Sequence, residues 1–207
     1  QPGAPLIEGE WQHVWDQVPS PDGRWIAVRL ARHTGYGETF RGVRLALIPA
    51  EGGAPIWVGG ADDAARPWRA AASPVWSPDG ARLAFMGAFD HKRDAGTAIY
   101  IVDPDAPGSA TERHRGERDS GLAVAWPRPD TLVSLRECGV NVNLYAVDAD
   151  DGAMTALLSG AFGSSGSIPI DTKATALALA FDRAGTTVGV VWGAAMQPRE
   201  VWAGPVG

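Results

Sequence analysis

A four-residue turn followed by a short apolar strand recurs along this chain, and it constrains the fold more than any other feature. Its clearest copy is Ser77-Pro78-Asp79-Gly80, which leads into Leu83-Ala84-Phe85. Proline presets φ at the second position, aspartate can bond its own backbone, and serine first with glycine last favours a type I turn. Three further copies, progressively weaker, begin at Ser20, Arg128 and Asp182.

The spacing of these turns predicts the architecture. Their last residues are Gly23, Gly80, Thr131 and Gly185, which gives steps of 57, 51 and 54 residues. A period near 50 with several short strands per unit is typical of a β-propeller, in which each repeat is one four-stranded blade. We therefore expect an all-β fold, a partial or small β-propeller of about four blades of four antiparallel strands. The expected blades, within a single domain 1–207, are approximately 11–59, 66–118, 119–168 and 172–204.

Small and aromatic residues recur at matching places in these units. A small residue stands between two large ones in the strand after each turn, at Ala27, Ala84, Ser134 and Gly189. Blades taper toward the axis, so neighbouring sheets are expected to approach closely where a side chain is missing. Trp76 and Trp126 end equivalent strands, so we expect them to be packing anchors between blades rather than a ligand platform.

Composition excludes several classes of function. The net charge is −6, and the most basic window, 114–118, is interrupted by Glu117, so no nucleic-acid partner is predicted. No apolar run approaches the ~18 residues of a membrane span, so no membrane partner is predicted either. Cys138 is the single cysteine, which excludes an intrachain disulfide and favours a packed thiol over a nucleophile. A reduced chain without an apolar signal region at residues 1–5 favours the cytoplasm.

No catalytic, cofactor-binding or metal-ligating residue is predicted. Gly163–Ser167 has the composition of a nucleophile elbow but not its Gly-x-Ser-x-Gly spacing, so a loop is favoured. Asp148–Gly152 places glycine fifth rather than sixth, which favours a hairpin turn over a calcium loop. The histidines show no metal-ligand spacing; they are His13, His33, His91 and His114. Glu137 beside Arg136 could point into a central channel, but a solvated pair at a loop edge is the favoured interpretation.

The fourth unit ends before a fourth strand. Either Pro5–Ile7 supplies that strand and closes a ring, or the fold continues in a longer parent protein. An open blade edge would otherwise favour self-association between chains.

The repeat unit resembles two known groups of propellers. The segment Trp76–Phe85, followed by Ile99–Asp103, resembles the repeats of TolB-type propellers and of the N-terminal propeller in serine peptidases of the prolyl oligopeptidase family (S9). Later segments are similar to the acylaminoacyl-peptidase branch of that family; they are Val124–Trp126, Arg136–Gly139, Leu144–Asp148, Phe181–Gly185 and Gln197–Trp202. The resemblance covers nearly the whole chain.

The resemblance implies a module without catalytic residues of its own. In the peptidase family the propeller caps an α/β-hydrolase domain and restricts entry to short peptides, while the catalytic serine, aspartate and histidine lie in the hydrolase. No such domain is found in this sequence, so we expect no enzymatic activity from the chain itself. Its expected partners are that hydrolase domain and, transiently, peptides. The alternative is a TolB-like scaffold that docks a protein on one face.

Overall fold

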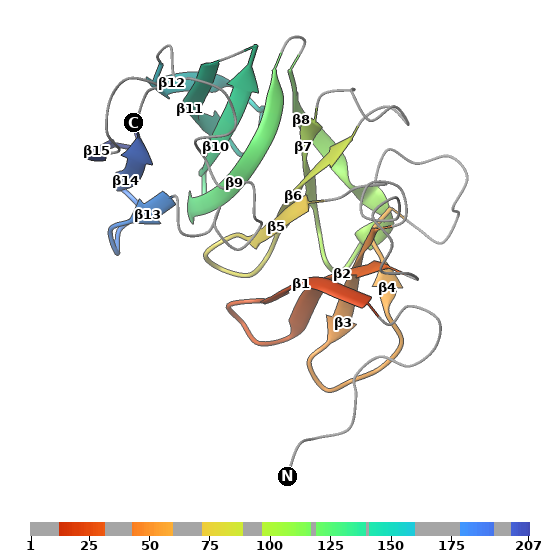
Figure 1. The fold of residues 1–207 in the computed structure, drawn as a ribbon. Coiled ribbons are helices and arrows are strands. Elements are labelled where there is room, and N and C mark those ends of the chain that lie inside the picture. Colours follow the sequence, from red (N-terminus) through yellow and green to blue (C-terminus); the bar gives the residue numbers. More distant parts are fainter. Residues whose placement is uncertain are drawn as a thin grey trace.

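In the computed structural model, the four sheets follow one another around a common centre (Figure 1). The structure describes residues 13–31, 43–59, 72–88, 97–116, 119–139, 141–159, 179–192 and 200–207. Every pairing between neighbouring strands in these sheets is antiparallel; the pairings are β1–β2, β2–β3, β3–β4, β5–β6, β6–β7, β7–β8, β9–β10, β10–β11, β11–β12, β13–β14 and β14–β15. The all-β propeller predicted from the repeat is confirmed.

Each sheet is one blade, and its strands follow in chain order. Blade 1 contains β1 (His13–Pro19), β2 (Trp25–Ala31), β3 (Arg44–Pro49) and β4 (Ile56–Trp57). Blade 2 contains β5 (Ala72–Trp76), β6 (Leu83–Ala88), β7 (Thr97–Val102) and β8 (Thr111–Arg115), with the short 3-10 helix η1 (Pro107–Ser109) before β8. Blade 3 contains β9 (Ser120–Arg128), β10 (Thr131–Cys138), β11 (Asn141–Asp148) and β12 (Met154–Leu158). Blade 4 contains β13 (Leu179–Phe181), β14 (Thr187–Trp192) and β15 (Glu200–Pro205).

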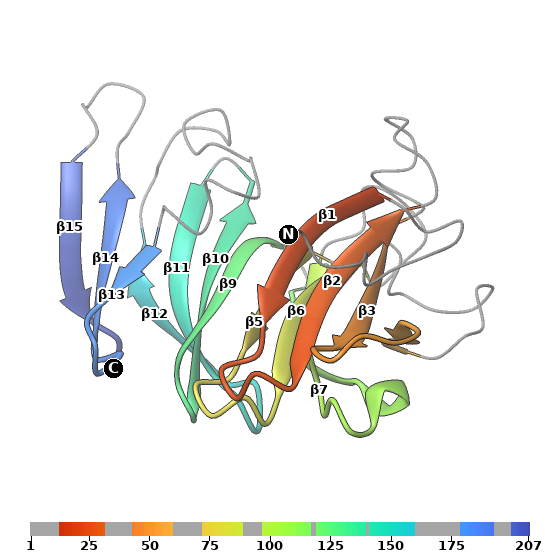
Figure 2. The same ribbon diagram turned by 90° about the horizontal axis from the view of Figure 1, so that it is seen from below.

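Blade 4 has three strands among the described residues, whereas the other blades have four. Pro5–Ile7, the segment expected to supply a fourth strand, lies outside the described residues. Figure 2 shows the blades side by side, with the tight turns between first and second strands at their lower ends.

The predicted turns are present and are closed by backbone hydrogen bonds. The Gly23 N–H donates to the Ser20 carbonyl at 3.0 Å, and the Gly80 N–H donates to the Ser77 carbonyl at 2.8 Å. Both glycines have positive φ, at 73° and 75°, a conformation that costs glycine little. The motif therefore sets the connection between the first two strands of blades 1 and 2.

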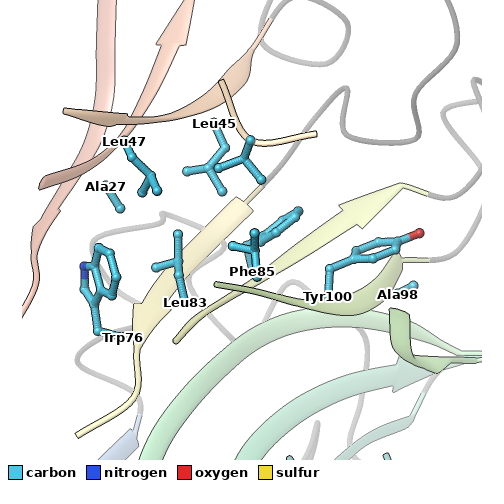
Figure 3. Close-up of a cluster of buried hydrophobic side chains, with 10 residues drawn as sticks. Ala27, Leu45, Leu47, Trp76, Leu83, Phe85, Ala98 and Tyr100 are labelled. Atoms are coloured by element: carbon cyan, nitrogen blue, oxygen red, sulfur yellow. The ribbon is translucent and has the colours of Figure 1, made fainter. Parts of the chain in front are cut away.

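Most of the hydrophobic core lies between blades (Figure 3), and a smaller cluster that includes Leu30 and Ile48 lies within blade 1. Ala27 and Leu47 of blade 1 face Trp76 and Leu83 of blade 2, and all four are at most 5% exposed. The Trp76 indole N–H also donates to the Val18 carbonyl of β1 at 2.9 Å. Ala84 lies in the next cluster with Trp126 of blade 3. Both tryptophans therefore act as anchors between blades, as predicted.

Ser134 does not occupy the position equivalent to Ala84. Ala84 pairs with Val75, next to Trp76, and in blade 3 it is Val133 that pairs with Ala125, next to Trp126. Val133 packs in a cluster with blade 4, whereas the Ser134 hydroxyl donates to the Ala123 carbonyl of its own sheet at 3.2 Å. Val133 follows Trp126 by seven residues, whereas Ala84 follows Trp76 by eight, and a one-residue shift moves a side chain to the opposite face.

Candidate functional site: the central cavity and the seam between blades 2 and 3

A cavity of about 650 Å³ lies where the first strands of the four blades converge. Its wall is built from β1, β5, β9 and β13, and most of its side chains are apolar. The lining residues are Val14, Trp15, Asp16, Gln17, Val18, Ser73, Pro74, Val75, Ala123, Val124, Ala125, Leu179 and Phe181. Concave, mostly apolar sites of roughly 300–1,000 Å³ are the usual setting for small-ligand binding. This cavity is therefore the candidate functional site.

β-bulges interrupt the strands that form the wall. In β1, Val14 pairs with Leu30 and Asp16 pairs with Arg29, so Trp15 is an extra residue without a partner in β2. In β5, the register breaks between Ala72 and Val75, and Ser73 has a φ of 50°. Bulges redirect side chains and are frequent beside active sites. Here the β1 bulge leaves Trp15 38% exposed on the cavity wall.

The β1 bulge also creates a cross-strand ion pair. Asp16 lies opposite Arg29 in the register, and its carboxylate pairs with the Arg29 guanidinium. Both side chains are largely buried, at 17% and 8% exposed. Asp16 is the one charged side chain among the described lining residues. The Arg29 guanidinium offsets its negative charge at the edge of the cavity.

The second polar feature lies at the seam between blades 2 and 3 and centres on Arg136. We call it the seam network; it comprises Arg136, Asp119, Thr97 and Gly121. Nη2 of Arg136 donates to Asp119 Oδ1 at 2.8 Å and to the Thr97 carbonyl at 2.9 Å. The Gly121 N–H donates to the Thr97 hydroxyl at 2.6 Å, and that hydroxyl donates to the Gly121 carbonyl at 3.1 Å. The network thus links β7 of blade 2 to blade 3.

Arg136 is fully buried, which corrects the expectation of a solvated pair with Glu137. Strand alternation sends the two side chains to opposite faces of β10, and Arg136 faces blade 2. A Cβ on Gly121 would lie 2.8 Å from Thr97 Oγ1 and 3.3 Å from Arg136 Nη1, so a side chain at this position would crowd the seam network. Nε and Nη1 of Arg136 have no hydrogen-bond acceptor among the described residues.

His114 lies beside this network, on β8. Burial is the main reason that its pKa is lowered, and the positive charge of Arg136 lowers the pKa further. The carboxylates of Asp119 and Glu112 act in the opposite direction. Its neutral form is therefore favoured at this seam.

Other residues considered from the sequence are placed apart from these two features. Cys138 is exposed, not packed as expected, because it ends β10 just before the hairpin to Asn141. The Asp148–Gly152 segment forms the predicted hairpin turn, in which Asp148 Oδ1 accepts hydrogen bonds from the backbone N–H groups of Asp150 and Asp151. His13 begins β1. His33, His91 and Gly163–Ser167 lie outside the described residues.

Sequence reasoning missed Trp15 and Asp16, and it assigned Arg136 to a solvated pair. The position of Arg136 directly after the mostly apolar run Leu132–Leu135 was the available signal for a buried cation. The sequence of β1 contains no pattern that predicts its bulge. Within the described ranges, no three histidine, cysteine, aspartate or glutamate side chains are grouped so as to hold a metal ion. No helix in that part of the chain is long and apolar enough to cross a membrane.

Comparison with known proteins places this architecture among peptidase and TolB propellers. No family model matches the chain. Dipeptidyl-peptidase 5 from Aspergillus oryzae and its counterpart from Aspergillus flavus are each 25% identical to it over 138 residues. The match covers 64% of this chain but only 19% of either relative, so the chain spans about a fifth of their length.

Solved structures agree on the fold. A puromycin-hydrolyzing peptidase from Mycobacterium tuberculosis superposes with a TM-score of 0.70 at 19% identity, over 97% of this chain and 28% of the peptidase. A TolB protein from Agrobacterium tumefaciens superposes with a TM-score of 0.60 at 20% identity, over 92% of this chain and 60% of that protein. The chain therefore has the β-propeller fold that these peptidase and TolB structures share, and its sequence is similar to part of dipeptidyl-peptidase 5.

Proposed function

We propose that this chain is a non-catalytic propeller module that gates the access of peptides to an α/β-hydrolase domain of an acylaminoacyl-peptidase-like serine peptidase. Its role is to admit or exclude substrates, and bond cleavage belongs to the hydrolase domain. The hydrolase domain and transiently bound peptides are its partners in this proposal. The cytoplasm is the compartment that we propose for it.

The observation that carries the proposal is the position of the cavity. Its wall is formed by the first strand of every blade, so a molecule in the cavity touches all four repeats. The wall is mostly apolar, and its one charged side chain, Asp16, is paired with Arg29. Such a surface can contact a peptide on its way to the hydrolase domain without cleaving it. The sequence similarity to dipeptidyl-peptidase 5 supports a peptidase as the parent protein.

The proposal is tested with purified chain and chromogenic acyl-amino-acid and dipeptidyl substrates. We expect no turnover above the rate of the buffer alone. Robust turnover that a serine-directed inhibitor abolishes would show that the chain carries its own nucleophile, and the proposal would then be wrong.

The alternative function is a TolB-like scaffold that docks a protein on one face. It is supported by the superposition on TolB from Agrobacterium tumefaciens, which extends over a larger share of that protein than of the peptidases. The two functions differ in what binds: a scaffold captures a folded protein and leaves short peptides unbound.

Self-association is a further proposal, and it concerns the edge of blade 4. Val201 and Trp202 of β15 are 80% and 50% exposed. Unprotected strand edges with exposed apolar side chains favour pairing between chains. The particle mass in solution tests this, because pairing doubles it and Trp202→Lys is expected to restore the mass of one chain.

A further inference from the structure

We propose that the cavity wall binds an extended peptide segment with uncharged, apolar side chains, and that Trp15 is its principal contact. This inference rests on the proposed function and deepens it by naming the class of peptide that the module accepts. Three features of the wall carry it: exposed apolar side chains, a neutralised charge and unpaired strand edges.

The wall offers apolar contact area that the fold itself does not cover. Five large hydrophobic side chains are exposed among the described residues, and two of them, Val14 and Trp15, are neighbours on this wall. The bulge in β1 leaves Trp15 without a cross-strand partner and turned toward the cavity. Exposed tryptophan within a concave site is a strong source of binding energy, because its ring buries a large area with few rotatable bonds.

The charge on the wall argues for an uncharged segment. A charged peptide side chain that enters an apolar cavity loses hydration and needs an opposite charge in return. Asp16 is the one charged lining residue in the described part of the chain, and its carboxylate already pairs with Arg29. Neither an acidic nor a basic side chain therefore finds a free counter-charge here.

The strands of the wall can also hold an extended backbone. Among the strands that the structure describes, β1, β5, β9 and β13 each stand at the end of their sheet, with one neighbouring strand apiece. An edge strand has backbone N–H and C=O groups without a partner strand on one side, and extended peptides bind such edges by adding hydrogen bonds. Side-chain contacts with Trp15 would then set the preference along the segment.

The test uses three end-blocked tripeptides and the 207-residue chain. They are acetyl-Ala-Phe-Ala-amide and its versions with glutamate or lysine in the middle, so that only the central side chain differs. Binding is followed by isothermal titration and by amide chemical shifts of the chain. We expect the phenylalanine peptide to bind at least about tenfold more tightly than either charged peptide.

Two tryptophan variants locate the binding site. Trp15→Ala is expected to weaken binding of the phenylalanine peptide by about tenfold, whereas Trp15→Phe retains most of it. Trp202→Ala is the matched control, because Trp202 is half exposed on β15 and does not line the cavity. Circular dichroism checks that each variant is folded, and if Trp15→Ala is not, the peptide series and Trp15→Phe still decide.

Equal affinity for charged and uncharged peptides would overturn the inference, as would a loss of binding caused by Trp202→Ala instead of Trp15→Ala. Failure of all three peptides to bind would also overturn it. That last result would leave the non-catalytic gating module in place, since that proposal is tested by substrate turnover and does not require measurable affinity.

Discussion

Removing the carboxylate of Asp119 is expected to destabilise the chain more than removing the guanidinium with which it pairs. Asp119 Oδ1 is 2.8 Å from Nη2 of Arg136. The Arg136 side chain is 0% exposed, whereas Asp119 is 16% exposed. In Asp119→Ala the arginine stays buried and loses its counter-charge. In Arg136→Met the remaining carboxylate still reaches water.

The magnitudes follow from this asymmetry. Breaking a buried pair so that an unpaired charge remains costs about 3–5 kcal/mol. We expect the loss of stability in Asp119→Ala to lie at the upper end of this range, because Nε and Nη1 of Arg136 already have no acceptor among the described residues. Arg136→Met leaves the Thr97 carbonyl without that donor, a loss of roughly 1–3 kcal/mol. The double variant loses no more than Arg136→Met, because no buried charge is left. The free energy of unfolding of a domain is typically about 5–15 kcal/mol, so the stability losses of all three variants are large enough to measure.

Urea unfolding followed by tryptophan fluorescence gives the three free energies of unfolding. The expected order of stability places Asp119→Ala below both Arg136→Met and the double variant. If Asp119→Ala costs less than Arg136→Met, or if the two losses simply add in the double variant, then Arg136 is not the buried, singly paired cation described here.

Two further predictions concern the anchors and the turns. Trp76→Phe is expected to cost about 1 kcal/mol more than Trp126→Phe in thermal unfolding, because the Trp76 indole N–H bonds the Val18 carbonyl whereas that of Trp126 has no partner among the described residues; equal losses would contradict this. The hydrogen bond from the Arg24 side chain, then that from Ser20, lowers the pKa of Asp22 to about 2. A carboxyl whose folded pKa lies below its unfolded value adds stability above the unfolded pKa and loses it as the pH falls. Wild-type stability is therefore expected to fall between about pH 4 and pH 2 more steeply than that of Asp22→Asn, as measured by urea midpoints.

The sequence predicted the features that depend on local chemistry. The Ser20–Gly23 and Ser77–Gly80 turns form because each contains residues that close a type I turn without help from the rest of the chain. Trp76 and Trp126 were assigned correctly as anchors, since a large aromatic side chain at a strand end needs a neighbouring surface to cover it. The spacing of these turns gave the repeat period, and that period predicted the β-propeller.

Strand register and long-range pairing could not be predicted from local sequence chemistry. Ser134 was assigned to the wrong face because the structural equivalent of Ala84 is Val133, which follows Trp126 by seven residues rather than eight, and alternation alone does not reveal such a shift. Arg136 was assigned to solvent because its counter-ion, Asp119, lies on the segment before β9 and meets it only in the folded chain. The Trp15 bulge is visible only in the register of β1 against β2, where Asp16 lies opposite Arg29.

The central claim concerns how successive sheets are held together. An aromatic side chain of one blade packs against the first strands of the preceding blade. Nuclear Overhauser contacts of the Trp76 indole test this most directly. We predict contacts from its N–H proton to the backbone of Val18 and from its ring to the Ala27 methyl group, which lie on β1 and β2 of the preceding blade. Contacts confined to residues of blade 2, with the indole N–H exchanging freely with solvent, would contradict the account.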